Sequence, residues 1–210
     1  MISAREALDR LREGNKRFAE EAQRDRGASH ERRRELTAAQ NPFAIVLGCS
    51  DSRVPAEIVF DQGLGDLFVI RVAGNIVAPS QVGSVEFAAE RFGTRLVVVL
   101  GHSNCGAIAA TLEDLRGGGA GSRHVQSIVD RIRPAVEPLL ETELRHQPEQ
   151  LTRQAIRANI RASANHLRHG SEVLERLIQR EGLLVVGAEY SLDTGVVDFF
   201  DHHASLRPEI

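Results

Sequence analysis

Four short runs of apolar residues recur along the chain, at 43–47 (FAIVL), 67–72 (LFVIRV), 96–100 (LVVVL) and 183–186 (LLVV). Each run is rich in β-branched residues and almost continuously apolar. Strands that are covered on both faces of a parallel sheet show this pattern, whereas half-exposed strands alternate between apolar and polar positions. We therefore expect an α/β fold with a central, mostly parallel sheet of about four strands.

Longer segments between these runs have the periodicity of amphipathic helices. In 123–145 the apolar positions Val125, Ile128, Val129, Ile132 and Val136 form one stripe, which is the spacing that buries one face of a helix. Helices are likewise predicted over 79–92, 105–116, 149–168 and 171–181. Right-handed crossovers between parallel strands place such helices on both faces of the sheet.

The two ends of the chain add further elements. Ser3 and Glu6 have the spacing of a capping box at the start of a helix over 2–22, and a second helix is predicted over 29–39. Segment 190–200 (YSLDTGVVDFF) predicts a turn at 193–195 and then an antiparallel edge strand. A length of 210 residues fits a single domain, 1–210, with an N-terminal helical arm (1–40) and an α/β core (41–210).

Composition narrows the class of protein. The chain is 42% hydrophobic and 26% charged with a formal net charge of −3, which is typical of a soluble globular protein and gives no reason to expect a nucleic-acid partner. No apolar run approaches the ~20 residues of a membrane span, and the first residues carry many charges, so we expect no membrane partner and a cytoplasmic location. In that reducing compartment the two cysteines are expected to be thiols or metal ligands.

Two of the apolar runs end in the same three residues followed by a metal-ligating side chain. Val-Leu-Gly precedes Cys49 at 46–48 and precedes His102 at 99–101, and Cys105 follows three residues later. Side chains at the carboxyl ends of neighbouring parallel strands converge. Two thiolates and one imidazole would leave a tetrahedral Zn²⁺ ion with one open position, as in a catalytic site. Either cysteine alone is more consistent with a small buried hydrophobic residue than with a metal ligand, but both cysteines and a histidine at matching strand ends favour the metal site.

Asp51 and Arg53 follow Cys49 directly. A Zn²⁺ ion with two thiolate ligands is formally neutral and acidifies its water less than a site with three histidines. Asp51 is therefore placed to accept a hydrogen bond from the zinc-bound water or hydroxide, and Arg53 to hold that carboxylate off the metal. A turn with a solvated Asp51–Arg53 ion pair is the alternative interpretation.

These motifs, CSDSR at 49–53 and HSNC at 102–105, closely resemble those of the β-class carbonic anhydrases, and the similarity extends over 49–77, 82–92, 97–108 and 185–199. The resemblance implies the reversible hydration of carbon dioxide to bicarbonate and a proton, by attack of zinc-bound hydroxide on CO₂. It implies one Zn²⁺ ion per chain, held by Cys49, His102 and Cys105. Asp51 and Arg53 would form the dyad that orients the hydroxide, and in a closed state Asp51 itself would become the fourth ligand.

The resemblance also implies that Gln40, Phe68 and Gly106 bind the substrate. Family members are dimers or higher assemblies with the active site near the subunit interface, so a homodimer or a homotetramer is expected.

One departure from the family distinguishes its subclasses. The allosteric subclass binds an inhibitory bicarbonate through a tryptophan, an arginine and a tyrosine, and Val46, Arg71 and Phe87 stand at those positions here. Only the arginine is retained. We therefore predict a plant-type, non-allosteric member without cooperative inhibition by bicarbonate.

Three other functions are compatible with the same residues. The zinc site could hydrolyse carbonyl sulfide or carbon disulfide, or the chain could be a zinc-binding homologue without catalysis. Cysteine nucleophile chemistry at Cys105 beside His102 is the third, but it would leave Cys49 without a task.

Overall fold

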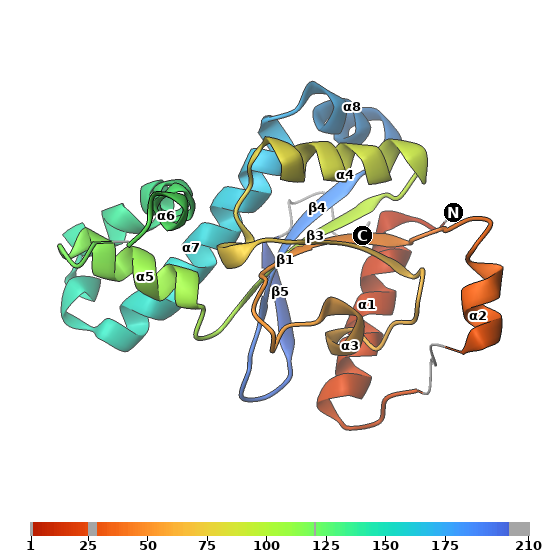
Figure 1. The fold of residues 1–210 in the computed structure, drawn as a ribbon, viewed down its shortest axis with the longest axis horizontal. Coiled ribbons are helices and arrows are strands. Elements are labelled where there is room, and N and C mark those ends of the chain that lie inside the picture. The colour runs from red at the N-terminus through yellow and green to blue at the C-terminus, as the bar shows by residue number, and fades with distance from the viewer. Residues whose placement is uncertain (1, 25–28, 120, 202–210) are drawn as a thin grey trace, which may run out of the picture.

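The computed structural model describes residues 2–24, 29–119 and 121–201. Its centre is a five-stranded sheet in the order β2-β1-β3-β4-β5 (Figure 1). The strands are β1 (Ala44–Gly48), β2 (Leu67–Arg71), β3 (Leu96–His102), β4 (Leu184–Tyr190) and β5 (Val197–Asp201). The first four strands are parallel and β5 runs antiparallel to β4, which confirms the predicted α/β fold with its antiparallel edge strand.

Helices cover both faces of the sheet (Figure 1). On one face lie α1 (Ala4–Ala19) and the short α3 (Ala56–Val59), and on the other lie α4 (Pro79–Arg91), α7 (Pro148–His169) and α8 (Glu172–Glu181). Beyond the sheet, α5 (Gly106–Leu115) and α6 (Arg123–Val136) pack on each other and on α7. The remaining helix of the arm is α2 (His30–Glu35).

Strand β3 shows why its sequence run is continuously apolar. Val97 and Val99 belong to the core beneath α4, α7 and α8, whereas Leu96, Val98 and Leu100 belong to the core beneath α1. All five side chains are fully buried. A strand between two helical layers has no face left for polar residues.

Some predicted boundaries were wrong. The helix predicted over 123–145 ends at Val136 and is followed by 3₁₀ turns at Glu137–Glu141 and Glu143–His146. Pro138 explains the break, because proline has no N–H to donate and its ring clashes with the preceding turn. The four-residue helix α3 was not predicted, since it is too short to show a periodicity. Among the described residues, no helix is both long and apolar enough to cross a membrane.

Helix α1 is tied to two distant parts of the chain by buried contacts. The predicted capping box of Ser3 and Glu6 starts the helix. Near its other end, Asn15 donates through Nδ2 to the carbonyl oxygens of Val59 (3.1 Å) and Gly195 (2.8 Å) and accepts the N–H of Val197 (2.7 Å). One buried amide thus joins the arm to α3 and to the start of β5.

Gly14 allows this close approach, because a Cβ at that position would overlap the carbonyl oxygen of Phe60. We expect Gly14→Ala to lower the free energy of unfolding by about 1–3 kcal/mol, the usual cost of overpacking. Urea denaturation measures this. The matched control is Gly83→Ala on α4, where a Cβ would meet nothing within 4 Å; it should raise stability by about 0.5–1 kcal/mol. Equal stability of Gly14→Ala and the wild type would contradict this docking of α1.

Candidate metal centre

Three ligand-bearing side chains meet at the carboxyl ends of β1 and β3. Cys49 is the residue after β1, His102 is the last residue of β3, and Cys105 caps the N-terminus of α5. Because β1 and β3 are parallel, with Gly48 beside Leu100, both strand ends reach the same edge of the sheet. The two Sγ atoms and a ring nitrogen of His102 lie within 4.8 Å of one another, and all three residues are buried.

The orientation of the His102 ring suits a metal ligand. Its Nδ1 lies 2.8 Å from the carbonyl oxygen of Ser103, which can only accept a hydrogen bond, so Nδ1 carries the proton. Nε2 therefore presents a lone pair, and it is buried with no hydrogen-bond partner among the described residues. A buried polar atom without a partner is costly. A metal ion held with the two cysteines would satisfy it, so the donor set fits Zn²⁺.

The two thiols differ in acidity when no metal is considered. The hydrogen bond between them stabilises a thiolate on Cys49, so the pKa of Cys49 is lowered and the pKa of Cys105 is raised. The N–H of Gly74 also donates to the Sγ of Cys49, at 3.3 Å. Burial lowers the pKa of His102, but the proximity of the Cys49 sulfur outweighs it, and the net shift of the pKa is upward.

Asp51 lies beside this group and is held by Arg53. The guanidinium Nε donates to Oδ1 at 2.9 Å and Nη2 donates to Oδ2 at 2.8 Å, while the backbone N–H of Arg53 also reaches Oδ1 at 3.0 Å. These hydrogen bonds hold the pKa of the Asp51 carboxyl well below its usual range. Oδ2 lies 3.8 Å from Nε2 of His102. An ionised carboxylate thus stands next to the three candidate ligands, held by a bidentate arginine.

Arg71 holds the segment that carries Cys49 and Asp51. From the end of β2 its Nε donates to the carbonyl oxygen of Cys49 at 3.0 Å, and its Nη2 donates to that of Asp51 at 2.5 Å. From the sequence, Arg71 was expected only at the position of an allosteric site, and this contact was not predicted. Its position at the end of a strand adjacent to β1 was the available signal, because such ends converge.

The three candidate substrate residues lie in different places. Gly106 follows Cys105 at the start of α5, with open space where a Cβ would project. The ring of Phe68 lies on β2 against the rings of Phe87 and Phe92, at centroid distances of 6.2 and 6.0 Å. Gln40 lines a separate surface pocket that includes Phe92. Within one chain, Gly106 therefore lies beside the candidate metal centre, whereas Phe68 and Gln40 do not.

A mostly parallel α/β sheet whose neighbouring strand ends present two cysteines and a histidine defines an α/β protein with a candidate Cys₂His metal centre. Comparisons with known proteins identify its family. The profile of the family described as Carbonic anhydrase matches residues 44–197. Carbonic anhydrase 2 of Mycobacterium tuberculosis is 36% identical over 208 residues, which cover 95% of this chain and 94% of that protein.

Comparison with solved structures points to the same family. The β-carbonic anhydrase CafA of the fungal pathogen Aspergillus fumigatus superposes with a TM-score of 0.74 at 26% identity, covering 94% of this chain and 90% of that one. A chain from the crystal structures of two tetrameric β-carbonic anhydrases of the ascomycete Sordaria macrospora shares the fold, with a TM-score of 0.69 at 24% identity over 80% of this chain and 84% of that one. The chain therefore belongs to the carbonic anhydrase family, in its β class.

The thiol pair gives a pH dependence for the metal-free protein. The lowered pKa of Cys49 contributes stability above the pKa of an unfolded thiol, and this contribution is lost as pH falls through the lower folded value. The raised pKa of Cys105 contributes stability below the unfolded value and loses it at higher pH. We expect the ultraviolet thiolate band to show one thiolate between the lowered pKa of Cys49, about 4, and the ordinary thiol pKa of about 8.5.

The control for this titration is Cys105→Ala, which removes the S–H donor and should move the Cys49 transition to higher pH. Two independent thiols, both titrating near the ordinary value of about 8.5 in the wild-type protein, would contradict the predicted sharing of one proton.

Proposed function

We propose that the chain catalyses the reversible hydration of carbon dioxide to bicarbonate and a proton, with one Zn²⁺ ion held by Cys49, His102 and Cys105. The observation that carries the proposal is the buried Nε2 of His102, which lacks a partner among the described residues and faces both cysteines beside the Asp51 carboxylate. Membership of the carbonic anhydrase family supports the same reaction.

When bound, Zn²⁺ supplies Lewis acidity and lowers the pKa of water. Residues of the chain orient the reacting water. Arg53 keeps Asp51 ionised, so the carboxylate accepts a hydrogen bond from the reacting water and directs its free lone pair toward carbon dioxide. The same bidentate contact restrains Asp51 from taking a coordination position, because the move would break two charge-assisted hydrogen bonds.

Assembly is part of the proposal. Phe68, Phe87 and Phe92, the aromatic cluster, lie at centroid distances of 5.7 to 6.2 Å from one another, and Phe87 is 54% exposed. Exposed, clustered aromatic side chains are typical of interface anchors. We propose a homodimer or a homotetramer in which a second copy covers this cluster, and in which Gln40 and Phe68 complete a substrate site that one chain leaves open. The tetrameric relatives from Sordaria macrospora support assembly.

The proposal includes the non-allosteric subclass. Val46 is fully buried in β1, in the place of the tryptophan of the allosteric subclass. Arg71, the one retained residue, is engaged with the carbonyl oxygens of Cys49 and Asp51. Both observations favour activity without cooperative inhibition by bicarbonate.

The role of Asp51 is tested by Asp51→Asn. We expect the variant to keep its zinc but to lose turnover by about 10- to 100-fold, because an amide nitrogen cannot accept the hydrogen bond from water. Stopped-flow hydration of carbon dioxide on zinc-quantified protein measures this. The matched control is Asp9→Asn, which breaks the exposed Asp9–Arg12 pair on α1 and should leave turnover unchanged.

Full turnover in Asp51→Asn would remove Asp51 from the mechanism. Zinc-loaded wild-type protein that does not hydrate carbon dioxide would exclude the proposed reaction. The same preparation is then assayed on carbonyl sulfide and carbon disulfide, and inactivity on all three substrates would indicate a zinc-binding homologue without catalysis.

Assembly is tested by Phe87→Arg, which places a charge in the aromatic cluster. We expect association to weaken by about 2 kcal/mol or more, the range of interface hot spots, as measured by sedimentation velocity at several protein concentrations. Val125→Arg is the control, because Val125 is 41% exposed on α6, away from the cluster. An unchanged assembly in Phe87→Arg would show that the interface lies elsewhere.

A further inference from the structure

One backbone N–H is directed at a candidate ligand sulfur. It belongs to Gly74, in the short turn Ala73–Asn75 after β2, and lies 3.3 Å from the Sγ of Cys49. The turn has an uncommon backbone, since Gly74 (φ 69°) and Asn75 (φ 43°) are consecutive left-handed residues. For a residue other than glycine this conformation is unfavourable, and it persists where surrounding contacts impose it.

Those contacts come from α7, more than eighty residues further along the chain. Asn159 donates through Nδ2 to the carbonyl oxygen of Gly74 at 2.8 Å, and Ser163 donates through Oγ to that of Asn75 at 3.0 Å. Both side chains are buried, with 2% and 5% of their surface exposed. They lie four residues apart, which places them on the same face of the helix.

Packing prevents the turn from moving to another position. A Cβ on Gly74 would lie 2.9 Å from the Cβ of Ala107 on α5 and 2.9 Å from Cδ1 of Ile132 on α6. Helix α7 also packs closely against β3. A Cβ on Gly101, next to His102, would lie 2.5 Å from Cδ1 of Ile160 on α7. The helix that binds the turn is therefore packed against the strand that carries His102.

We propose that Asn159 and Ser163 are positioning residues for the metal centre. By holding the two carbonyls of the turn they keep the Gly74 N–H directed at the Cys49 thiolate. A hydrogen bond to a ligand sulfur reduces the electron density that the sulfur donates to the metal. It therefore restores part of the Lewis acidity that the metal loses to its two thiolate ligands. This inference rests on the proposed metal centre and deepens it, because it assigns to α7 a part in tuning that centre.

If Asn159 and Ser163 had only a structural role, their loss would lower stability without changing the electronic properties of the metal centre. Buried carbonyls need donors in any protein, so losing either side chain will lower stability whatever else it does. The distinguishing readout is therefore spectroscopic. In protein loaded with Co²⁺ in place of zinc, the thiolate-to-cobalt charge-transfer band reports the energy of the sulfur lone pairs, and loss of an N–H donor raises that energy.

The variants are Ser163→Ala and Asn159→Asp, each of which removes one donor to the turn. We expect the charge-transfer band to move to lower energy in both, and zinc affinity, measured by competition with a chelator, to fall by about tenfold or more. The matched control is Thr94→Val, which removes another buried hydroxyl, donating to the carbonyl oxygen of Pro42 at 2.7 Å. It should lose stability without moving the band.

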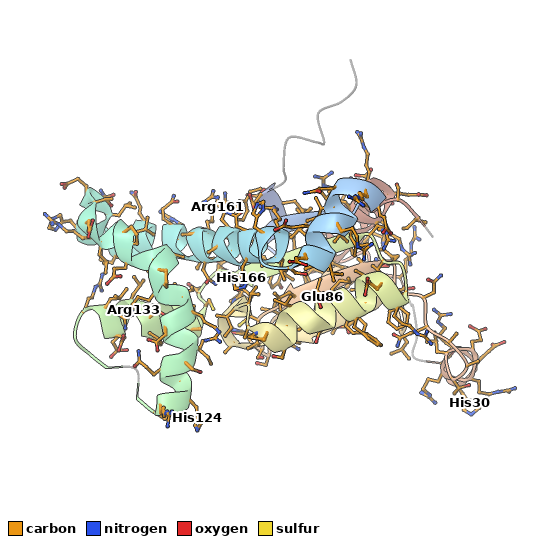
Figure 2. All side chains as sticks on the ribbon, turned by 90° about the horizontal axis from the view of Figure 1, so that it is seen from above. His30, Glu86, His124, Arg133, Arg161 and His166 are labelled. Carbon is orange, nitrogen blue, oxygen red and sulfur yellow. The ribbon has the colours of Figure 1, made fainter. Side chains whose placement is uncertain are left out.

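A conservative variant provides rescue. Ser163→Thr keeps the hydroxyl, and Ser163 borders a cavity of about 710 Å³ between α4, α6 and α7 that can accept the added methyl group. Figure 2 labels Glu86 on α4 and His166 on α7, which line this cavity. Ser163→Thr should retain the wild-type band.

A band in Ser163→Ala and Asn159→Asp that matches the wild-type band, or that moves no more than in Thr94→Val, would overturn the positioning role while leaving the metal centre intact. Wild-type protein that binds neither Co²⁺ nor Zn²⁺ would overturn the metal centre, and this inference with it.

Discussion

The parallel pairing of β1 with β3 is the constraint on which the site depends. It places Gly48 beside Leu100, so that the residues after each strand, Cys49 and His102, emerge at one edge of the sheet. Cys105 joins them because the chain turns directly from β3 into α5. An antiparallel arrangement of the same two strands would separate the cysteine and the histidine by the length of a strand, and the donor set would not form.

The residues around these strand ends also determine the net charge of the proposed metal site. Two thiolates and a neutral imidazole would neutralise the charge of a divalent zinc ion, and every further charged or polar contact would adjust that balance. Arg53 keeps the Asp51 carboxylate ionised, Arg71 fixes the backbone that carries it, and the Gly74 N–H points at the Cys49 sulfur. In the proposed zinc site, whose two thiolates would weaken the acidity of bound water, hydrogen bonds from several elements of the fold would compensate.

Much of this arrangement could be predicted from the sequence, because it depends on local patterns. Continuous apolar runs predicted the parallel strands, and the repeated Val-Leu-Gly placed Cys49 and His102 at matching strand ends. Contacts between distant segments could not be predicted in this way. Neither the support of the Ala73–Asn75 turn by α7 nor the hydrogen bonds of Arg71 leaves a periodic signal. Gln40 and Phe68 were grouped with the site by resemblance alone, and in one chain they lie apart from it.

Asn15 sets an order of events during synthesis. Because its side chain binds Val59, Gly195 and Val197, the docking of α1 is complete only after β5 has been synthesised. The three candidate ligands are all translated by residue 105, well before α7. Both thiols are therefore synthesised before α7 can pack against them, and metal ions and oxidants can reach them until that helix encloses the site.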